Sequence, residues 1–165
     1  MGDISLIDIF KNSLETSGFF DITIVKNNLN MYEISLRKIK EYKLHIFLRK
    51  ITYAGWSDKP EKRRVQVSSF DLSKLPASGG SVTCMIIGVQ ELFDRYIFVA
   101  WNIYEYGSHA TNRSCYVHTT SIYNGFLKGY LSRVDQSQKI WVSDSYNLDK
   151  LILDYMDFNY SSLGE

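Results

Sequence analysis

The stretch from Arg49 to Ser69, RKITYAGWSDKPEKRRVQVSS, places a strand pattern, a charged polar loop and a second strand pattern in immediate succession. The loop and its flanks hold four cations and two aromatic residues, namely Lys59, Lys62, Arg63, Arg64, Tyr53 and Trp56. An ordinary hairpin does not need four cations at its tip, and cations beside aromatic rings are suited to holding phosphates and touching bases. The stretch therefore predicts a pair of strands whose connecting loop binds a polyanion.

The distribution of charge supports this interpretation, although the formal net charge is only +1. Residues 37 to 64 include ten cations and three acids, whereas the rest of the chain holds 9 cations and 15 acids. One basic face on a domain is the electrostatic footprint of a polyanionic ligand. For Lys38, Lys40 and Lys43 we favour an alternative, that of lysines that guard the edge of a sheet. For the cations of the loop we favour ligand contact.

Length and composition are those of an ordinary globular domain. At 165 residues the chain fits one domain, 1–165, which buries roughly 70% of the surface that its unfolded form exposes. No segment approaches the roughly 18 uninterrupted apolar residues of a membrane helix, and the N-terminal MGDISLIDIF resembles neither a signal peptide nor a transit peptide. Cys84 and Cys115 have no CxxC spacing, which predicts free, buried thiols. We therefore expect a cytoplasmic protein with no membrane partner.

Hydrophobic periodicity divides the chain into a helix, a series of strands and two later helices. Apolar residues at helical spacing predict helices at about 5–15, 121–133 and 147–157. Runs of β-branched and aromatic residues predict strands within 21–25, 31–36, 43–54, 63–70, 82–90, 96–104 and 114–119. The predicted organisation is an N-terminal helix (1–18), a β-barrel (about 20–120) and C-terminal helices (about 121–157). The fold class is α+β, with a strongly curved, mostly antiparallel sheet or pseudobarrel flanked by two or three helices.

The chain lacks the motifs of a self-sufficient enzyme, so we expect a non-catalytic module without a metal or a cofactor. Asp21, Glu41 and Lys43 match the loose pattern of a Mg²⁺-dependent nuclease, but three residue types at such spacing arise often by chance. The histidines show no metal-binding spacing. His45 alternates in its strand as an ordinary surface residue would. Neither a nucleophile elbow nor a phosphate-binding glycine loop is present.

A second polar loop, GSHATNRS at residues 107–114, separates two predicted strands. Its side chains that can hydrogen-bond phosphates or base edges are Ser108, His109, Asn112, Arg113 and Ser114. Asn and Arg match adenine and guanine in the major groove. Taken alone, the loop is equally well explained as a hydrophilic hairpin tip. Taken with the first loop, it predicts a clamp on a duplex, in which phosphate contacts give affinity and base contacts give sequence discrimination.

The order of these patterns resembles that of a known family. RKITYAG, a polar loop and EKRRVQVSS precede MIIGVQELFDRYIFVAWNI, a loop, SCYVHTTSI and the closing NLDKLILDYM. Over residues 40 to 157 this order is similar to the N-terminal DNA-recognition domains of LlaJI-type restriction endonucleases and to methylase-associated DNA-sensing domains of bacterial restriction systems. Gly55 and the basic strand 63–66 match the family's glycine-bearing loop and Gln-containing strand. Asn102 replaces an aspartate, and Trp56 stands where the family has small or basic residues.

The resemblance implies a pseudobarrel akin to the plant transcription-factor DNA-binding fold. Two arms, here Tyr53 to Gln66 and Ser108 to Ser114, would grip the major groove, and a separate nuclease or motor domain or subunit would cleave. The candidate DNA-binding residues are Arg49, Tyr53, Trp56, Ser57, Lys59, Lys62, Arg63, Arg64, Gln66, Ser108, His109, Asn112, Arg113 and Ser114. We therefore expect a sequence-specific double-stranded DNA-binding domain of a prokaryotic restriction system, acting in phage defence.

Other functions remain open at this point. A sensor of methylated bases would flip the base into an aromatic pocket, for which 24 aromatic residues give ample material. A protein-interaction module would turn the basic face toward an acidic partner, and salt would weaken that association as it weakens DNA binding. We place direct readout of a duplex ahead of the sensing of methylated bases, since most aromatic residues in strands belong to the core; a direct test of duplex binding distinguishes DNA recognition from a protein-interaction module.

Overall fold

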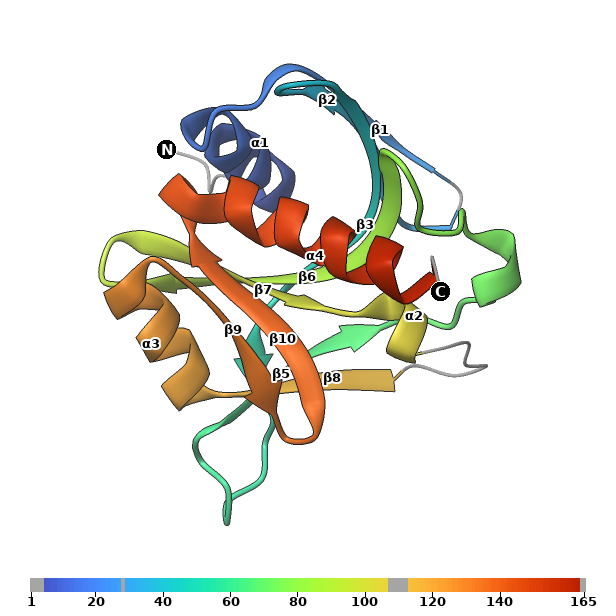
Figure 1. Cartoon of the computed structure of the whole chain (residues 1–165). Coiled ribbons are helices and arrows are strands. Elements are labelled where there is room, and N and C mark those ends of the chain that lie inside the picture. Colours follow the sequence, from blue (N-terminus) through green and yellow to red (C-terminus); the bar gives the residue numbers. More distant parts are fainter. Residues whose placement is uncertain (1–4, 28, 107–112, 164–165) are drawn as a thin grey trace.

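The computed structural model describes residues 5–27, 29–106 and 113–163 (Figure 1). The helices are α1 (Leu6–Thr16), α2 (Ile103–Tyr106), α3 (Thr119–Lys128) and α4 (Leu148–Leu163), with the 3₁₀ turns η1 (Leu72–Lys74) and η2 (Ser145–Asn147). The strands are β1 (Phe20–Lys26), β2 (Tyr32–Arg37), β3 (Glu41–Lys50), β4 (Thr52–Tyr53), β5 (Lys62–Val67), β6 (Val82–Leu92), β7 (Arg95–Trp101), β8 (Arg113–His118), β9 (Tyr130–Asp135) and β10 (Gln138–Asp144). Along the described residues, no helix is long and apolar enough to cross a bilayer.

The strands form two sheets. A seven-stranded sheet has the order β1-β2-β3-β6-β7-β10-β9, and a three-stranded sheet has the order β4-β5-β8. The β3–β6 pair is parallel, and every other strand pair is antiparallel. Figure 1 shows β1 to β3 bending around α1 and α4. The α+β class and the curved, mostly antiparallel sheet are confirmed. Within the described residues, the strands do not close into a barrel, because the large sheet keeps β1 and β9 as edges.

Each face of the large sheet is covered by a different layer. One hydrophobic core joins α1 and α4 to the sheet, with Leu44, Ile46 and Leu48 of β3 in it. The other core joins the three-stranded sheet, α2 and α3 to the opposite face, and Phe47 of β3 belongs to it. The central strand β3 is therefore buried on both faces. The three-stranded sheet and the α1–α4 layer lie on opposite sides of the molecule.

The two cysteines lie in the core on the side of the three-stranded sheet. Cys84 on β6 and Cys115 on β8 are free and fully buried. Burial raises the pKa of the Cys84 thiol to about 11, a hydrogen bond with Tyr104 opposing the effect. Burial raises the pKa of the Cys115 thiol to about 12. The prediction of free, buried thiols is confirmed, and neither group has the character of an activated thiolate.

Helix α1 shows why its residues fold as predicted. Ser5 is the N-cap, and its hydroxyl accepts a hydrogen bond from the backbone N–H of Asp8 at 3.3 Å. Phe10 and Leu14, one helical turn apart, are fully buried against the large sheet. Gly18 follows the helix at a φ of 110°, which a side chain would disfavour. The N-cap, the apolar stripe and the terminating glycine therefore all agree with the predicted N-terminal helix.

The predicted helix from 121 to 133 is wrong beyond residue 128. Gly129, at a φ of 82°, donates its N–H to the carbonyl of Gly125 at 2.8 Å and ends α3 there. The chain continues as β9 and β10, two paired strands that the sequence did not predict. The edge strand β9 is mostly exposed, so its few apolar residues show no clear period. The C-terminal part is therefore a helix, a strand pair and a second helix.

His45 is a buried residue, which corrects the expectation that it lies on the surface. Only 8% of it is exposed, because both faces of β3 are covered. Its Nδ1 lies 3.5 Å from a carboxylate oxygen of Glu33 on β2. Burial lowers the pKa of His45, the Glu33 carboxylate raises it and Lys43 lowers it further, the net direction being downward. The folded protein therefore holds His45 neutral at pH values at which the unfolded chain has begun to protonate.

This arrangement makes stability depend on pH. Below the ordinary histidine pKa of 6.5 the unfolded state binds more protons than the folded state, so the free energy of unfolding falls as the pH is lowered. We expect urea unfolding to give a smaller free energy at about pH 5.5 than at about pH 7.5. His45→Gln should reduce this difference because glutamine does not titrate. An equal pH dependence in both proteins would contradict the assignment.

Candidate nucleic-acid interface

The three-stranded sheet brings together residues from the two predicted arms. Strand β5 pairs with β8 so that Lys62 opposes His118, Arg64 opposes Tyr116 and Gln66 opposes Ser114. The intervening residues Val65, Val67, Cys115 and Val117 lie in the core. Since side chains alternate across a strand, the opposite side of this sheet presents Lys62, Arg64, Gln66, Ser114, Tyr116 and His118. We call these six residues the outer face.

Aromatic rings hold the cations at one end of the outer face. The ammonium of Lys62 lies 4.1 Å from the ring centroid of Trp56 and 4.3 Å from that of Tyr116. The two rings lie 5.7 Å apart. The ammonium of Lys59 lies 5.0 Å from the ring centroid of Trp56, so this ring contacts two lysines. Trp56, the position at which the chain departs from the family it resembles, therefore packs on β8 and orders two lysines.

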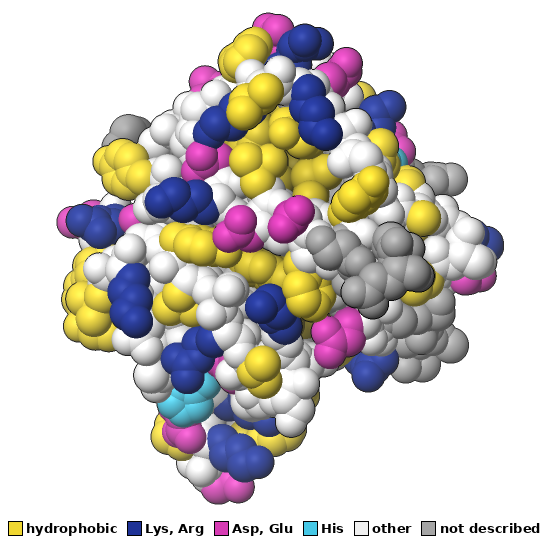
Figure 2. All heavy atoms as spheres, viewed as in Figure 1, with side chains coloured by type: hydrophobic (Ala, Val, Ile, Leu, Met, Phe, Trp, Pro, Cys, Tyr) yellow, Lys and Arg dark blue, Asp and Glu magenta, His cyan; other side chains and the backbone are white. Residues whose placement is uncertain are grey.

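Arg63 and Tyr53 shape the loop between β4 and β5. The guanidinium of Arg63 lies 5.3 Å from the ring centroid of Tyr53 and donates to the carbonyl of Pro60 at 2.6 Å. The hydroxyl of Tyr53 donates to the carbonyl of Trp56 at 2.8 Å. Ser57 and Lys59 are exposed in this loop, which projects at the bottom of Figure 1. Figure 2 shows Lys and Arg side chains at the same place, together with hydrophobic and acidic ones.

Among the described residues, the cations of this region form no ion pair with an acid. Within the part of the chain that the structure describes, no ion pair joins a carboxylate to Lys59, Lys62, Arg63, Arg64 or Arg113. The Nε of Arg64 is also buried without a hydrogen-bond partner among those residues. Lys38 differs, since its ammonium lies 2.5 Å from the Asp149 carboxylate and ties the β2–β3 turn to α4. An aromatic ring carries no net charge, so a cation held on a ring keeps its charge for a ligand.

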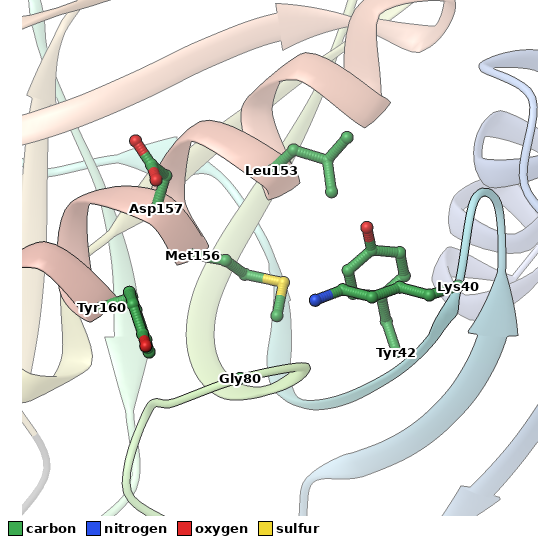
Figure 3. A pocket seen from close by; sticks show the side chains of 7 residues that line it. All are labelled: Lys40, Tyr42, Gly80, Leu153, Met156, Asp157 and Tyr160. Atoms are coloured by element: carbon green, nitrogen blue, oxygen red, sulfur yellow. The ribbon is translucent and has the colours of Figure 1, made fainter.

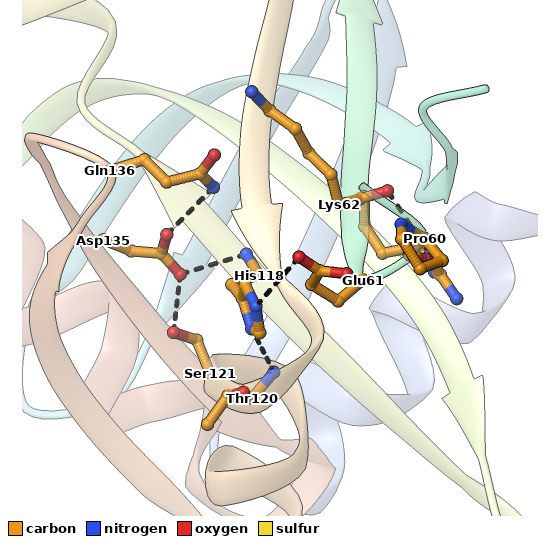
Figure 4. A network of polar contacts seen from close by, with 9 residues as sticks. Pro60, Glu61, Lys62, His118, Thr120, Ser121, Asp135 and Gln136 are labelled. Atoms are coloured by element: carbon orange, nitrogen blue, oxygen red, sulfur yellow. Dashed lines mark hydrogen bonds and ion pairs between the residues drawn. The ribbon is translucent and has the colours of Figure 1, made fainter. Parts of the chain in front are cut away.

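A polar network fixes the C-terminal end of β8, where His118 pairs with Lys62 (Figure 4). The Asp135 carboxylate on β9 accepts from the backbone N–H of His118 at 3.1 Å and from the Ser121 hydroxyl at 2.6 Å. It also accepts from the Gln136 amide at 3.0 Å. The Nε2 of His118 lies 3.9 Å from the Glu61 carboxylate. Strand β8, helix α3 and the β9–β10 turn are therefore held together beside the outer face, and no local sequence signal predicted this network.

The second predicted arm is only partly described. Ser108, His109 and Asn112 lie outside the described residues. Arg113 begins β8, where its guanidinium lies 4.3 Å from the ring centroid of Tyr106 and donates to the Tyr106 carbonyl at 3.1 Å. The Tyr106 hydroxyl donates to the carbonyl of Ser114. Both residues are thus anchored to α2.

The two arms leave opposite ends of the β5–β8 pair. One end is the Lys62–His118 pair, next to the first loop, and the other is the Val67–Arg113 pair, next to the second. Five residue steps separate these pairs, a distance of roughly 17 Å in an antiparallel sheet. The clamp on a duplex remains a prediction, but the strand pair between the arms is available as a third contact surface.

Arg49 lies apart from the outer face. It is on β3, half-buried, with its guanidinium donating to the carbonyl of Leu48 at 2.9 Å and lying 5.5 Å from the ring centroid of Phe47. Burial lowers the pKa of Arg49, and Tyr32 raises it. Its contacts are those of a residue that packs beside the core, so it is the candidate least connected to the rest.

The nuclease alternative involves residues on separated strands. Asp21 is on β1, whereas Glu41 and Lys43 are on β3, with β2 between these strands. Glu41 lies 3.8 Å from Arg37. Within the described residues, no group of three or more His, Cys, Asp or Glu side chains is placed to hold a metal ion.

Two hollows lie on different sides of the large sheet. A groove of about 570 Å³ lies between β8 and the β9–β10 turn, with Lys62, Tyr116 and Gln138 among its lining residues. A pocket of about 410 Å³ lies between α4 and the β2–β3 turn, where Leu153 and Met156 face Tyr42 (Figure 3). The groove adjoins the outer face, and the pocket is on the α4 side.

Fold and site together define an α+β domain that carries a cationic, aromatic-lined strand surface on one side. Residues 42–151, from β3 to the beginning of α4, match the family described as Methylase-associated X1, and the chain belongs to this family. The family confirms the resemblance to methylase-associated domains and relates the domain to restriction–modification systems. Neither the curated proteins nor the solved structures include a match to the chain.

Proposed function

We propose that the chain is the sequence-specific double-stranded DNA-recognition domain of a restriction system. The observation that carries this proposal is the group of cations held on aromatic rings without carboxylate partners among the described residues. Unpaired cations favour a polyanion, because each phosphate neutralised releases condensed counterions. The family's association with methylases supports DNA as that polyanion.

The β5–β8 pair would lie against the major groove, which is wide enough for a two-stranded β-ribbon. Arg64 and Gln66 alternate along β5 on the outer face, and Gln66 is exposed. Arginine matches guanine and glutamine matches adenine at the major-groove edge, so these two residues would read bases. Lys59 and Lys62 would contact the flanking phosphates, and the two arms would extend these contacts.

Cleavage would belong to a separate nuclease or motor domain or subunit. Asp21 of the nuclease alternative is separated by β2 from Glu41 and Lys43 on β3, and the sequence carries no other catalytic motif. The domain would therefore act by directing its partner to a site on DNA. Incubation with duplex and Mg²⁺ should leave the DNA intact; cleavage that disappears in Lys43→Ala would favour the nuclease alternative.

Binding of labelled duplex, followed by fluorescence anisotropy over a range of salt concentrations, tests the proposal. If Lys59 and Lys62 each neutralise a phosphate, the logarithm of the association constant should fall with the logarithm of salt at a slope of about −2. Selection from randomised DNA, with and without methylation, would then identify the bases read. Absence of binding to any duplex at low salt would contradict the proposal and favour a protein-interaction module.

A further inference from the structure

We propose that the groove between β8 and the β9–β10 turn receives a single nucleotide extruded from the duplex. This inference rests on the proposed function, because the nucleotide comes from DNA bound at the outer face. The groove has a volume of about 570 Å³, which is within the range of roughly 300–1,000 Å³ found for small-ligand sites. Lys62, Ser114 and Tyr116 belong both to the groove and to the outer face. A nucleotide leaving the duplex there would enter the groove directly.

The free edge of β8 forms one wall of the groove. Because β8 is an edge strand of the three-stranded sheet, alternate backbone groups point away from β5. The carbonyls of Ser114 and Tyr116 accept hydrogen bonds from the side chains of Tyr106 and Trp101. These bonds hold the edge in place and prevent the two carbonyls from pairing with another strand. The wall is therefore fixed and polar, which suits a planar ligand with hydrogen-bonding edges.

The lining combines the groups that an extruded nucleotide needs. Tyr106 and Tyr116 supply aromatic surface, and Lys62 and Arg113 supply positive charge for the phosphates on either side. Gln136 and Gln138 offer amides for the base edge. Glu105, the one acid of the lining, can accept a hydrogen bond from the amino group of cytosine or adenine. Aromatic, cationic and amide groups thus surround one cavity.

The opposite wall is the β9–β10 turn, whose backbone is strained. Gln136 and Ser137 have φ values of 52° and 71°, and two-residue hairpins with this geometry prefer Asn and Gly. Strained backbone that persists is held by its surroundings. Here Asp135, which binds the Gln136 amide and the backbone of His118, connects the turn to β8. The turn therefore stays at a fixed position across the groove, and it holds the side chains of Gln136 and Ser137 there.

Extrusion of a nucleotide predicts a preference for mismatched DNA, which direct readout of an intact duplex does not predict. Unstacking and unpairing a base costs less at a mismatch than at a matched pair. A domain that extrudes a nucleotide should therefore bind a duplex with one mismatch more tightly than the matched duplex. A reader of intact base pairs should bind the two equally, or the mismatch more weakly.

The experiment compares a matched fluorescein-labelled duplex with the same duplex carrying one T·T mismatch. We expect the mismatched duplex to bind about tenfold more tightly. A 2-aminopurine beside the mismatch should gain fluorescence on binding, because it loses a stacking partner. Gln138→Trp fills the groove without changing charge, so it should abolish the tenfold preference.

Ser132→Trp is the matched control, because Ser132 is exposed on β9 of the same strand pair and does not line the groove. It should keep the mismatch preference. Matched binding without a mismatch preference, or a preference that survives Gln138→Trp, would overturn this inference and leave the proposed function standing. Absence of binding to both duplexes would overturn both.

Discussion

Replacing Arg63 and Arg64 together by alanine is expected to lower affinity for duplex DNA about a hundredfold at about 100 mM salt. Arg64 lies on the outer face and has no carboxylate partner among the described residues. Arg63 points to the other side of β5 and binds Tyr53 and the carbonyl of Pro60. One substitution therefore removes a direct contact, and the other releases the loop that holds Lys59.

The single variants separate these two roles. Arg64→Ala should weaken binding and relax preference at one base position, since a bidentate arginine–guanine contact is worth about 1–3 kcal/mol. Arg63→Ala should weaken binding to all sequences alike, because it acts through the loop. In the double variant the slope of log affinity against log salt should become less steep by about 1, because the released loop loses the phosphate contact of Lys59 whereas Arg64 contacts a base.

A control variant with the same loss of charge distinguishes a local site from general attraction. Lys11 on α1 and Lys150 on α4 are exposed on the opposite side of the large sheet. Lys11→Ala with Lys150→Ala removes the same two charges and should leave both affinity and salt slope nearly unchanged. Equal loss of affinity in the two double variants would contradict an interface on the three-stranded sheet.

The extent to which the sequence predicted the fold depended on the strength of each local pattern. Helix α1, strands β3, β6 and β7 and helix α4 carry long apolar patterns, and each was found near its predicted position. Strands β9 and β10 were missed because α3 leads into them through Gly129 without a proline or a polar run. The division into two sheets is a matter of long-range pairing, which local periodicity does not encode.

The same reasoning applies to the candidate site. Alternation within β5 and β8 predicted which residues share a face of each strand, but not that Arg64 would oppose Tyr116. Trp56 departs from the family pattern, and its packing on Tyr116 is formed only when the chain folds back on β8. The groove was beyond prediction because one of its walls comes from the β9–β10 turn. Charge clustering in sequence located the site, and the tertiary fold determined its shape.

Gly88→Ala is expected to destabilise the protein by about 1–3 kcal/mol, because a side chain at Gly88 would collide with the buried side chains packed over it. A Cβ atom at this position on β6 would lie 2.6 Å from Cγ1 of Ile51 and 2.9 Å from Cγ1 of Val65. Both neighbours are β-branched and buried, so they have little freedom to move away. Urea unfolding measures the loss. Gly79→Ala is the control, because a Cβ there meets nothing within 4 Å.

A double-mutant cycle tests whether this clash is the cause. Ile51→Ala removes the nearest atom, so Gly88→Ala should cost less in that background than in the wild type, a non-additivity expected of residues in contact. Equal costs in the two backgrounds would show that Gly88 matters for another reason.

Because Val65 precedes Gln66 and follows Arg64 on β5, the clash should also shift the outer face. Gly88→Ala should therefore weaken duplex binding even at temperatures where the protein stays folded, whereas Gly79→Ala should not.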